Sequence, residues 1–216
     1  SRREPAERGL AGPDPWNLIR VMPAKGSLEK YSDKLLPSFL RQTHKEEKFM
    51  RTKTRVLVEG ALAVAMTVAF SHLKLWRMPQ GGSVTLENIP LLLFALRHGV
   101  KWGVGAGLVA GLVQLLLGGY VVHPIQALLD YPLAFGVLGI AALIRKPLWA
   151  GLTLGSCGRL ICHVLSGVVF FGSYAPEGTN VWLYSIVYNS SYMVPNLALS
   201  ILVTYMVWKR LSHINQ

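Results

Sequence analysis

The chain has 216 residues, of which 51% are hydrophobic and only 15% are charged, and its formal net charge is +11. This length suits one domain, and the low charged fraction argues against an ordinary soluble globule, in which about a quarter of the residues are charged. The positive charge does not indicate a nucleic-acid-binding protein, because from Met50 onward the basic residues stand at the ends of apolar segments.

Long apolar segments follow Met50 and predict an all-α membrane protein with six transmembrane helices, with five or seven as alternatives. A helix needs roughly 20 mainly apolar residues to cross a hydrocarbon core of about 30 Å. The predicted helices are Thr54 to Leu75, Asn88 to Leu96, Trp102 to Leu117, Ile125 to Ile144, Leu148 to Phe171 and Trp182 to Trp208. The second and third are short, so we expect one of them to tilt or to span only part of the membrane.

Basic residues collect at every second junction between these segments. They are Arg51, Lys53 and Arg55 before the first, Arg97 and Lys101 after the second, Arg145 and Lys146 after the fourth, and Lys209 and Arg210 after the sixth. The alternate junctions contain glycines and no basic residues, apart from Lys74 and Arg77 at the first outer boundary. Because Lys and Arg favour cytoplasmic junctions, we expect cytoplasmic N- and C-termini.

Alanines line one face of the first predicted helix. Ala61 and Ala65 form a small-xxx-small pattern, which lets a second helix approach closely. That second helix belongs either to this chain or to another protein.

Polar side chains interrupt the last three predicted helices, although a charged residue near the bilayer centre costs at least about 2.5 kcal/mol. The polar residues are Gln126, Asp130 with neighbouring Tyr131, Arg159, His163, Tyr184, Tyr188 and Asn189. Gln126 and Asp130 are four residues apart, as are Arg159 and His163, so each pair shares one helix face.

Two interpretations of these polar residues stay open. In the first, Asp130 and Arg159 form an interhelical ion pair that only holds the bundle together. In the second, Asp130 and nearby aromatic faces recognise an organic cation that carries a flat ring. Aromatic residues that fall near the same predicted outer ends are Tyr120, Tyr131, Phe171, Trp182 and Tyr184.

The two cysteines give no sign of a metal site. Cys157 and Cys162 lie in one apolar segment without CxxC spacing. We expect both to be buried thiols, and we expect neither a metal nor a cofactor.

Three segments together resemble one protein family closely. They are Met78 to Val84, His123 to Tyr131, and Phe170 to Pro176 followed by Val181 to Ser185, Tyr188 and Asn189. From about Arg55 to Trp208 the chain resembles the thiamine-specific substrate-binding subunit (S component) of energy-coupling factor (ECF) transporters. The resemblance implies a multi-pass protein of the bacterial cell membrane that captures thiamine at the outer face and has no catalytic activity.

The resemblance also implies roles for individual residues. It places Asp130 against the aminopyrimidine with Tyr131 beside it, His163 and Phe171 at ring-stacking positions, Tyr184 and Asn189 along the pocket, and Gln126, Tyr120 and Trp182 as further lining residues. Arg159 would pair with Asp130 or face the hydroxyethyl end, where phosphate esters of thiamine could fit. Ala61 and Ala65 would dock on a transmembrane coupling protein driven by two ATPase subunits.

The chain departs from the family near Gly81 to Thr85, where a tryptophan and a glutamate of the family have no clear match. Other functions also stay open. One is an S component for a thiamine precursor or a related vitamin, another is an intramembrane enzyme with Asp130 and His163 as an acid–base pair, and a third is a scaffold or channel without saturable ligand binding.

Residues 1–49 show no hydrophobic period. Read back through the genetic code, Asn17 to Gly26 can be encoded by a sequence that resembles the core of the thiamine pyrophosphate riboswitch, and Lys45 to Phe49 by a purine-rich ribosome-binding site. We therefore interpret residues 1–49 as the conceptual translation of a non-coding leader RNA, with the protein beginning at Met50. The alternative is a disordered, basic cytoplasmic extension.

Overall fold

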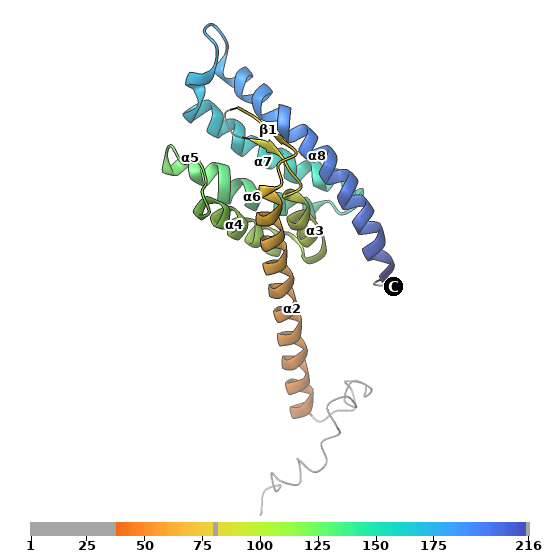
Figure 1. Cartoon of the computed structure of the whole chain (residues 1–216). Helices are drawn as coiled ribbons and strands as arrows, with labels where there is room; N and C mark the ends of the chain where they lie inside the picture. Colours follow the sequence, from red (N-terminus) through yellow and green to blue (C-terminus); the bar gives the residue numbers. More distant parts are fainter. Residues whose placement is uncertain (1–37, 80–81, 215–216) are drawn as a thin grey trace, which may run out of the picture. The chain divides into compact units, whose positions relative to one another are not determined.

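The structure is a computed structural model that describes residues 38–79 and 82–214 (Figure 1). It divides into two units, residues 1–52 and 53–216, which are considered separately. The described residues of the first unit form the beginning of helix α2, which runs over Ser38–His72. The predictions for residues 1–37 lie outside the described residues, and the leader interpretation of residues 1–49 stays a prediction that the nucleotide sequence can test.

Helices make up nearly all of the described second unit. In chain order the elements after α2 are α3 (Asn88–His98), α4 (Val100–Leu116), α5 (Pro124–Leu128), the π-helical η2 (Leu129–Leu133), α6 (Ala134–Val137), the 3-10 helix η3 (Leu138–Leu143), α7 (Leu148–Phe170), the short η4 (Gly172–Tyr174) and α8 (Val181–Ile214). Segments α5 to η3 follow one another directly and form the fourth predicted helix. A two-stranded antiparallel sheet, β1 (Trp76–Arg77) with β2 (Ser83–Val84), lies in the first loop and was not predicted.

The all-α membrane fold predicted from the sequence is confirmed. Four helices of the described chain are long and apolar enough to cross a membrane, namely Phe49–His72, Pro124–Leu143, Leu148–Phe170 and Val181–Arg210. The other two predicted segments form the shorter helices α3 and α4. With 11 residues, α3 is only about 16 Å long and cannot cross the bilayer alone. Instead it is almost entirely buried in the bundle, where Leu91, Leu92 and Leu96 form a core with Phe135 and Leu152.

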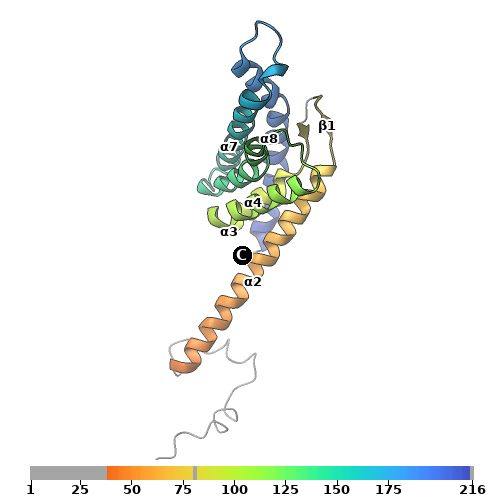
Figure 2. The same ribbon diagram turned by 90° about the vertical axis from the view of Figure 1, so that its left-hand side faces the viewer.

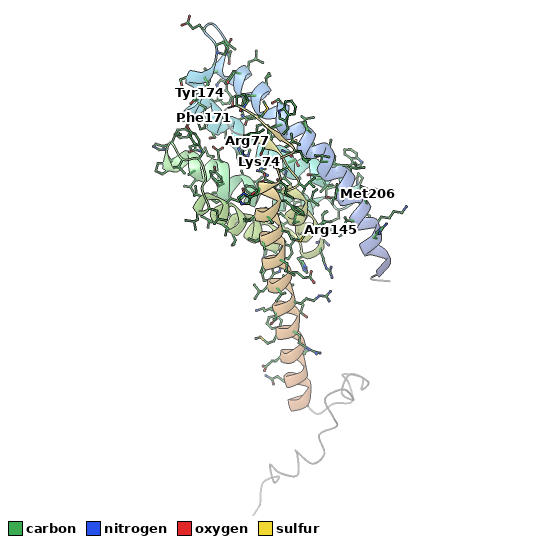
Figure 3. The ribbon with its side chains drawn as sticks, in the orientation of Figure 1. Lys74, Arg77, Arg145, Phe171, Tyr174 and Met206 are labelled. Atoms are coloured by element: carbon green, nitrogen blue, oxygen red, sulfur yellow. The ribbon has the colours of Figure 1, made fainter. Side chains whose placement is uncertain are left out.

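Helices α7 and α8 run side by side (Figure 2). Arg145 precedes α7 and Phe171 follows it, so the basic and aromatic junctions lie at opposite ends of this helix (Figure 3). The predicted burial of the thiols is wrong for Cys157, whose side chain is exposed on α7, whereas Cys162 is half-buried.

Glycines bring α4 against the fourth helix with backbone nearly touching backbone. A Cβ atom added to Gly107 would lie 2.7 Å from the carbonyl carbon of Phe135, and one on Gly111 would lie 2.5 Å from that of Tyr131. Only glycine permits such a close approach, and in lipid the attraction comes from this packing. The contact fixes the backbone that carries Asp130 and Tyr131.

The π-helical turn η2 interrupts the fourth helix at the same place. It contains Asp130, Tyr131 and Pro132. Because Pro132 has no backbone N–H, the regular α-helical hydrogen bonding cannot continue through it. Isolated π turns of this kind occur frequently at functional sites, since they change the direction in which side chains point.

The alanine face of α2 points away from the rest of the described bundle. Ala61 and Ala65 are exposed, while Gly60 and Ala63 on the other face pack toward Phe94 of α3. The interpretation in which Ala61 and Ala65 pack against a helix of this chain is therefore wrong for the described residues.

An ion pair and a hydrogen bond also join α2 to α3. Glu59 of α2 contacts His98 Nε2 at 2.7 Å and Arg97 Nε at 3.3 Å, both in the last turn of α3. Helix α3 is thus tied to α2 at its C-terminal end.

Candidate functional site

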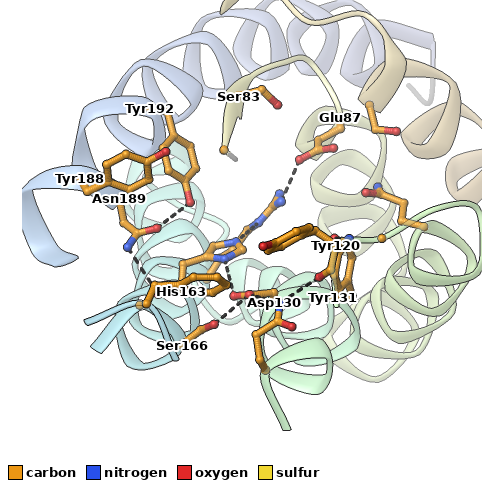
Figure 4. A pocket seen from close by; sticks show the side chains of 18 of the residues that line it. Ser83, Glu87, Tyr120, Asp130, Tyr131, His163, Ser166, Tyr188, Asn189 and Tyr192 are labelled. Carbon is orange, nitrogen blue, oxygen red and sulfur yellow. Dashed lines mark hydrogen bonds and ion pairs between the residues drawn. The ribbon is translucent and has the colours of Figure 1, made fainter. Parts of the chain in front are cut away.

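A cavity of about 300 Å³ opens among the described helices, close to the lower limit of roughly 300 Å³ for small-molecule sites (Figure 4). All of the predicted substrate-binding residues except Trp182 line it. They are Tyr120, Gln126, Asp130, Tyr131, Arg159, His163, Phe171, Tyr184 and Asn189. Trp182, at the start of α8, is not among the residues that line this cavity, and its side chain is 50% exposed.

Asp130 is held by three hydrogen-bond donors. Its Oδ2 accepts from Gln126 Nε2 at 2.7 Å and from Ser166 Oγ at 2.8 Å, and its Oδ1 lies 3.0 Å from His163 Nδ1. An ionised carboxylate has about four acceptor positions, so one is left for a ligand. Gln126 is itself fixed, since its amide donates to Tyr120 O and accepts from Val122 N–H.

A hydrogen-bonded chain runs from Asp130 to Glu87 along one wall of the cavity. Arg159 Nε donates to His163 Nε2 at 3.3 Å, which assigns the imidazole proton to Nδ1, from where it is donated to Asp130. At the other end of the chain, Arg159 Nη2 lies 2.8 Å from Glu87 Oε1. With a neutral imidazole this chain carries two negative charges and one positive charge.

Arg159 is therefore the partner of Glu87, and the predicted ion pair between Asp130 and Arg159 is wrong. The guanidinium also donates to Asn88 Oδ1 and lies 4.0 Å above the ring of Phe135. Both Arg159 and Glu87 are buried, with exposed fractions of 6% and 9%. A buried charge needs such a partner, because leaving it unpaired costs several kcal/mol.

Aromatic rings form the walls beside Asp130. Tyr120 and Phe171 stack with ring centroids 6.2 Å apart, and the Tyr131 hydroxyl accepts a 2.6 Å hydrogen bond from Tyr120 N–H. On α8, Tyr184 stacks with Tyr188 at 6.0 Å. These rings offer negative π faces to a flat cationic ligand.

A second polar group extends from α8. Asn189 donates from Nδ2 to Ser185 O at 2.9 Å, and its Oδ1 accepts from the Tyr192 hydroxyl at 2.7 Å. Tyr192 also meets the His163 ring edge-on, with centroids 6.3 Å apart. Asn189 is thereby positioned with its donors and acceptors largely satisfied.

Comparison with known proteins identifies the family. The model of the family described as Thiamine transporter protein (Thia_YuaJ) matches residues 57–216. The chain belongs to this thiamine transporter family.

Individual relatives agree. The thiamine transporter ThiT of Bacillus subtilis (strain 168) is 41% identical over 166 residues, which cover 68% of this chain and 86% of that protein. ThiT of Lacticaseibacillus paracasei is 31% identical over 168 residues, covering 68% and 84%. A solved structure of ThiT from Listeria monocytogenes superposes with a TM-score of 0.67 at 27% identity, covering 73% of this chain and 96% of that one.

Membership of the thiamine transporter family, together with the apolar helices, makes this chain a multi-pass protein of the bacterial cell membrane. It also removes the intramembrane enzyme as an alternative, because the relatives are named as transporters. Within residues 38–79 and 82–214, no group of three or more His, Cys, Asp or Glu side chains is arranged to hold a metal ion.

Several lining residues of this thiamine transporter family member were missed from the sequence. Glu87, Ser166 and Tyr192 line the cavity, as do Gly82 and Ser83 from the loop in which a tryptophan and a glutamate of the family had no clear match. Ser166 lies three residues after His163, and Tyr192 lies four after Tyr188, so helical spacing could have found both. Glu87 gave no such signal, because it lies at the start of a short helix.

Proposed function

We propose that this chain binds thiamine in the cavity beside Asp130 and serves as the S component of an ECF importer. The observation that carries the proposal is the Asp130 carboxylate, which keeps an acceptor position toward a cavity walled by aromatic rings. Thiamine is a monocation made of an aminopyrimidine and a thiazolium ring. Its amino group is a donor for the carboxylate, and its two flat rings suit the aromatic walls.

Charge supports the same ligand. The chain Glu87–Arg159–His163–Asp130, of which Glu87 and Arg159 are buried and the other two partly buried, carries one net negative charge when His163 is neutral, which matches one positive charge on thiamine. Lys74 lines the cavity too, but its side chain is exposed and solvent screens its charge. Because these groups are buried or partly buried, their net charge attracts a bound cation more strongly than the charge of a surface residue does.

Coupling to other subunits is proposed from the exposed face of α2. Ala61 and Ala65 present small side chains that are open on this face, with Leu57 and Leu62 exposed nearby. A helix of a transmembrane coupling protein could approach closely here, and that protein would be driven by two ATPase subunits. Capture at the outer face is proposed because Phe171 and Tyr120 lie at the ends of α7 and α4 opposite the basic junctions.

The test is thiamine binding by the purified protein in detergent, measured by isothermal titration calorimetry, with the variant Asp130→Asn. We expect wild type to bind and Asp130→Asn to bind about 100-fold more weakly, since a hydrogen bond to a charged acceptor contributes about 1.5–3 kcal/mol. Glu177→Gln, which removes one exposed carboxylate away from the cavity, is the charge-matched control and should bind like wild type.

Two results would contradict the proposal. Absence of saturable thiamine binding by wild type would favour a scaffold or channel. Tighter binding of the isolated aminopyrimidine than of thiamine would favour a precursor as the ligand.

A further inference from the structure

Three basic residues gather at one corner of the bundle, away from the cavity. Lys101 lies in the first turn of α4, and Arg145 and Lys146 lie between η3 and α7. All three residues are exposed, and none of them lines the cavity. Figure 3 shows Arg145 at the end of the bundle opposite Phe171. Lys101, Arg145 and Lys146 are called the corner patch below.

The fold brings these cations together from two separate junctions. The η3 segment packs against both α3 and α4. The Nη2 atom of Arg145 lies 3.5 Å from the position that a Cβ atom on Gly99 would occupy, so its guanidinium covers the turn between α3 and α4. Lys101 follows Gly99 by two residues, so their Cα atoms are at most about 7 Å apart. The corner patch is therefore one cluster of like charge.

Carboxylates do not neutralise the corner patch within residues 53–79 and 82–214. The four acidic residues of this range are Glu59, Glu87, Asp130 and Glu177. Two of them line the cavity, and Glu177 lies in the loop before α8, near the other end of α7. Glu59 is engaged by two arginines and a histidine of α2 and α3. In this range the three cations of the patch form no ion pair and can accept an external anion.

Exposed apolar side chains surround the patch. Trp102 follows Lys101 directly, and Trp149 lies three residues after Lys146, with exposed fractions of 40% and 60%. Leu143, at the end of η3, is also exposed. Tryptophan favours the headgroup level of a bilayer, and exposed aliphatic side chains of a membrane protein meet acyl chains. The surface around the patch thus faces lipid, and this favours a lipid headgroup over an acidic protein surface as the anion.

We propose that the corner patch binds an anionic phospholipid of the cytoplasmic leaflet, with the lipid phosphate at Arg145 and the acyl chains along Leu143. Guanidinium groups bind phosphate through paired N–H donors, and each lysine adds a point charge. Basic clusters between helices on the cytoplasmic side are typical sites for anionic headgroups. One phosphate then contacts cations from both junctions and holds them together. A zwitterionic phospholipid binds more weakly, because its own ammonium is repelled.

The experiment measures Kd for phosphatidylglycerol and for phosphatidylcholine by native mass spectrometry of the purified full chain in detergent. We expect wild type to bind phosphatidylglycerol about tenfold or more tightly than phosphatidylcholine. In Lys101→Gln/Arg145→Gln this preference should fall to about threefold or less, because two of the three charges are gone. The control Lys74→Gln/Arg77→Gln removes two charges at the outer junction and should keep the wild-type preference.

Further measurements make the outcome decisive. Thiamine affinity of Lys101→Gln/Arg145→Gln should stay within about twofold of wild type, because the patch lies outside the cavity. If this variant does not fold, Lys146→Gln alone should lower the lipid preference several-fold. Inorganic phosphate in about tenfold excess should not displace phosphatidylglycerol, since it lacks the acyl chains.

Three results would overturn the inference. They are equal affinity of wild type for the two lipids, an equal loss of preference in the control, and displacement of the lipid by inorganic phosphate. An unchanged preference in Lys101→Gln/Arg145→Gln, combined with lost co-purification of ATPase subunits, would assign the patch to a protein contact and overturn it as well. Absence of thiamine binding by wild type would overturn the proposed function alone.

Discussion

Gly111 offers the sharpest test of how the fold positions Asp130. In Gly111→Ala the new Cβ would lie 2.5 Å from the carbonyl carbon of Tyr131 and 2.6 Å from Pro132 Cα, whereas ordinary contact begins at 3.4 Å. Both opposing atoms are backbone, so no side chain can rotate away. The π-helical turn must retreat by about 0.9 Å, the difference between these distances.

Overpacking of this kind costs about 1–3 kcal/mol, and the rigid contact places Gly111→Ala near the upper end. The melting temperature should fall by roughly 6–12 °C, at about 2–4 °C per kcal/mol. Thiamine binding should weaken by about tenfold or more, because binding groups must stay within about 0.5 Å of their productive geometry. Thermal unfolding in detergent and calorimetry measure the two effects.

Gly105 on the same helix is the matched control. No atom lies within 4 Å of a Cβ built there, so Gly105→Ala should leave binding unchanged and stabilise α4 by up to about 1 kcal/mol. Equal effects of the two substitutions on thiamine affinity would refute the idea that close packing of α4 positions the site.

Two further predictions concern α8 and α2. Tyr192→Phe removes the hydroxyl that donates to Asn189 Oδ1, and should weaken thiamine binding roughly fivefold by calorimetry, since an unsatisfied buried acceptor costs about 1 kcal/mol or more. The control Tyr205→Phe, at an exposed position of α8, should have no effect, and equal losses of affinity in the two variants would contradict the role of the Tyr192 hydroxyl. Ala65→Phe should leave thiamine affinity within about twofold but reduce thiamine uptake by cells more than tenfold, because the ring fills the open alanine face. Met66→Phe on the adjoining exposed surface is the control, and unimpaired uptake by Ala65→Phe would argue against docking of a coupling protein on the alanine face.

The helices were predictable because their signal is local. Each apolar segment ends at a basic or glycine-containing junction, and the structure places a helix on every predicted segment. The four-residue spacing likewise predicted that Gln126 and Asp130 share one face of their helix and that Arg159 and His163 share one face of theirs. The structure brings these four residues to one cavity.

The pairing of charges was not predictable in the same way. Opposite charges at Asp130 and Arg159 suggested an ion pair, but Arg159 meets Glu87, which is 72 residues away in sequence. That contact depends on how the short α3 packs against α7, and spacing within either helix does not contain this information. The π-helical turn at Asp130 also changes side-chain direction in a manner that a regular helical period cannot anticipate.

Helix α3 is anchored by charge at both ends and enclosed by apolar side chains between them. Glu87 and Asn88 at its start hold Arg159 of the cavity wall, and Arg97 and His98 at its end hold Glu59 of α2. A rigid rod about 16 Å long thus spans the distance from the ligand chamber to the helix with the open alanine face. It cannot slide along its axis without breaking an ion pair at one end or the other.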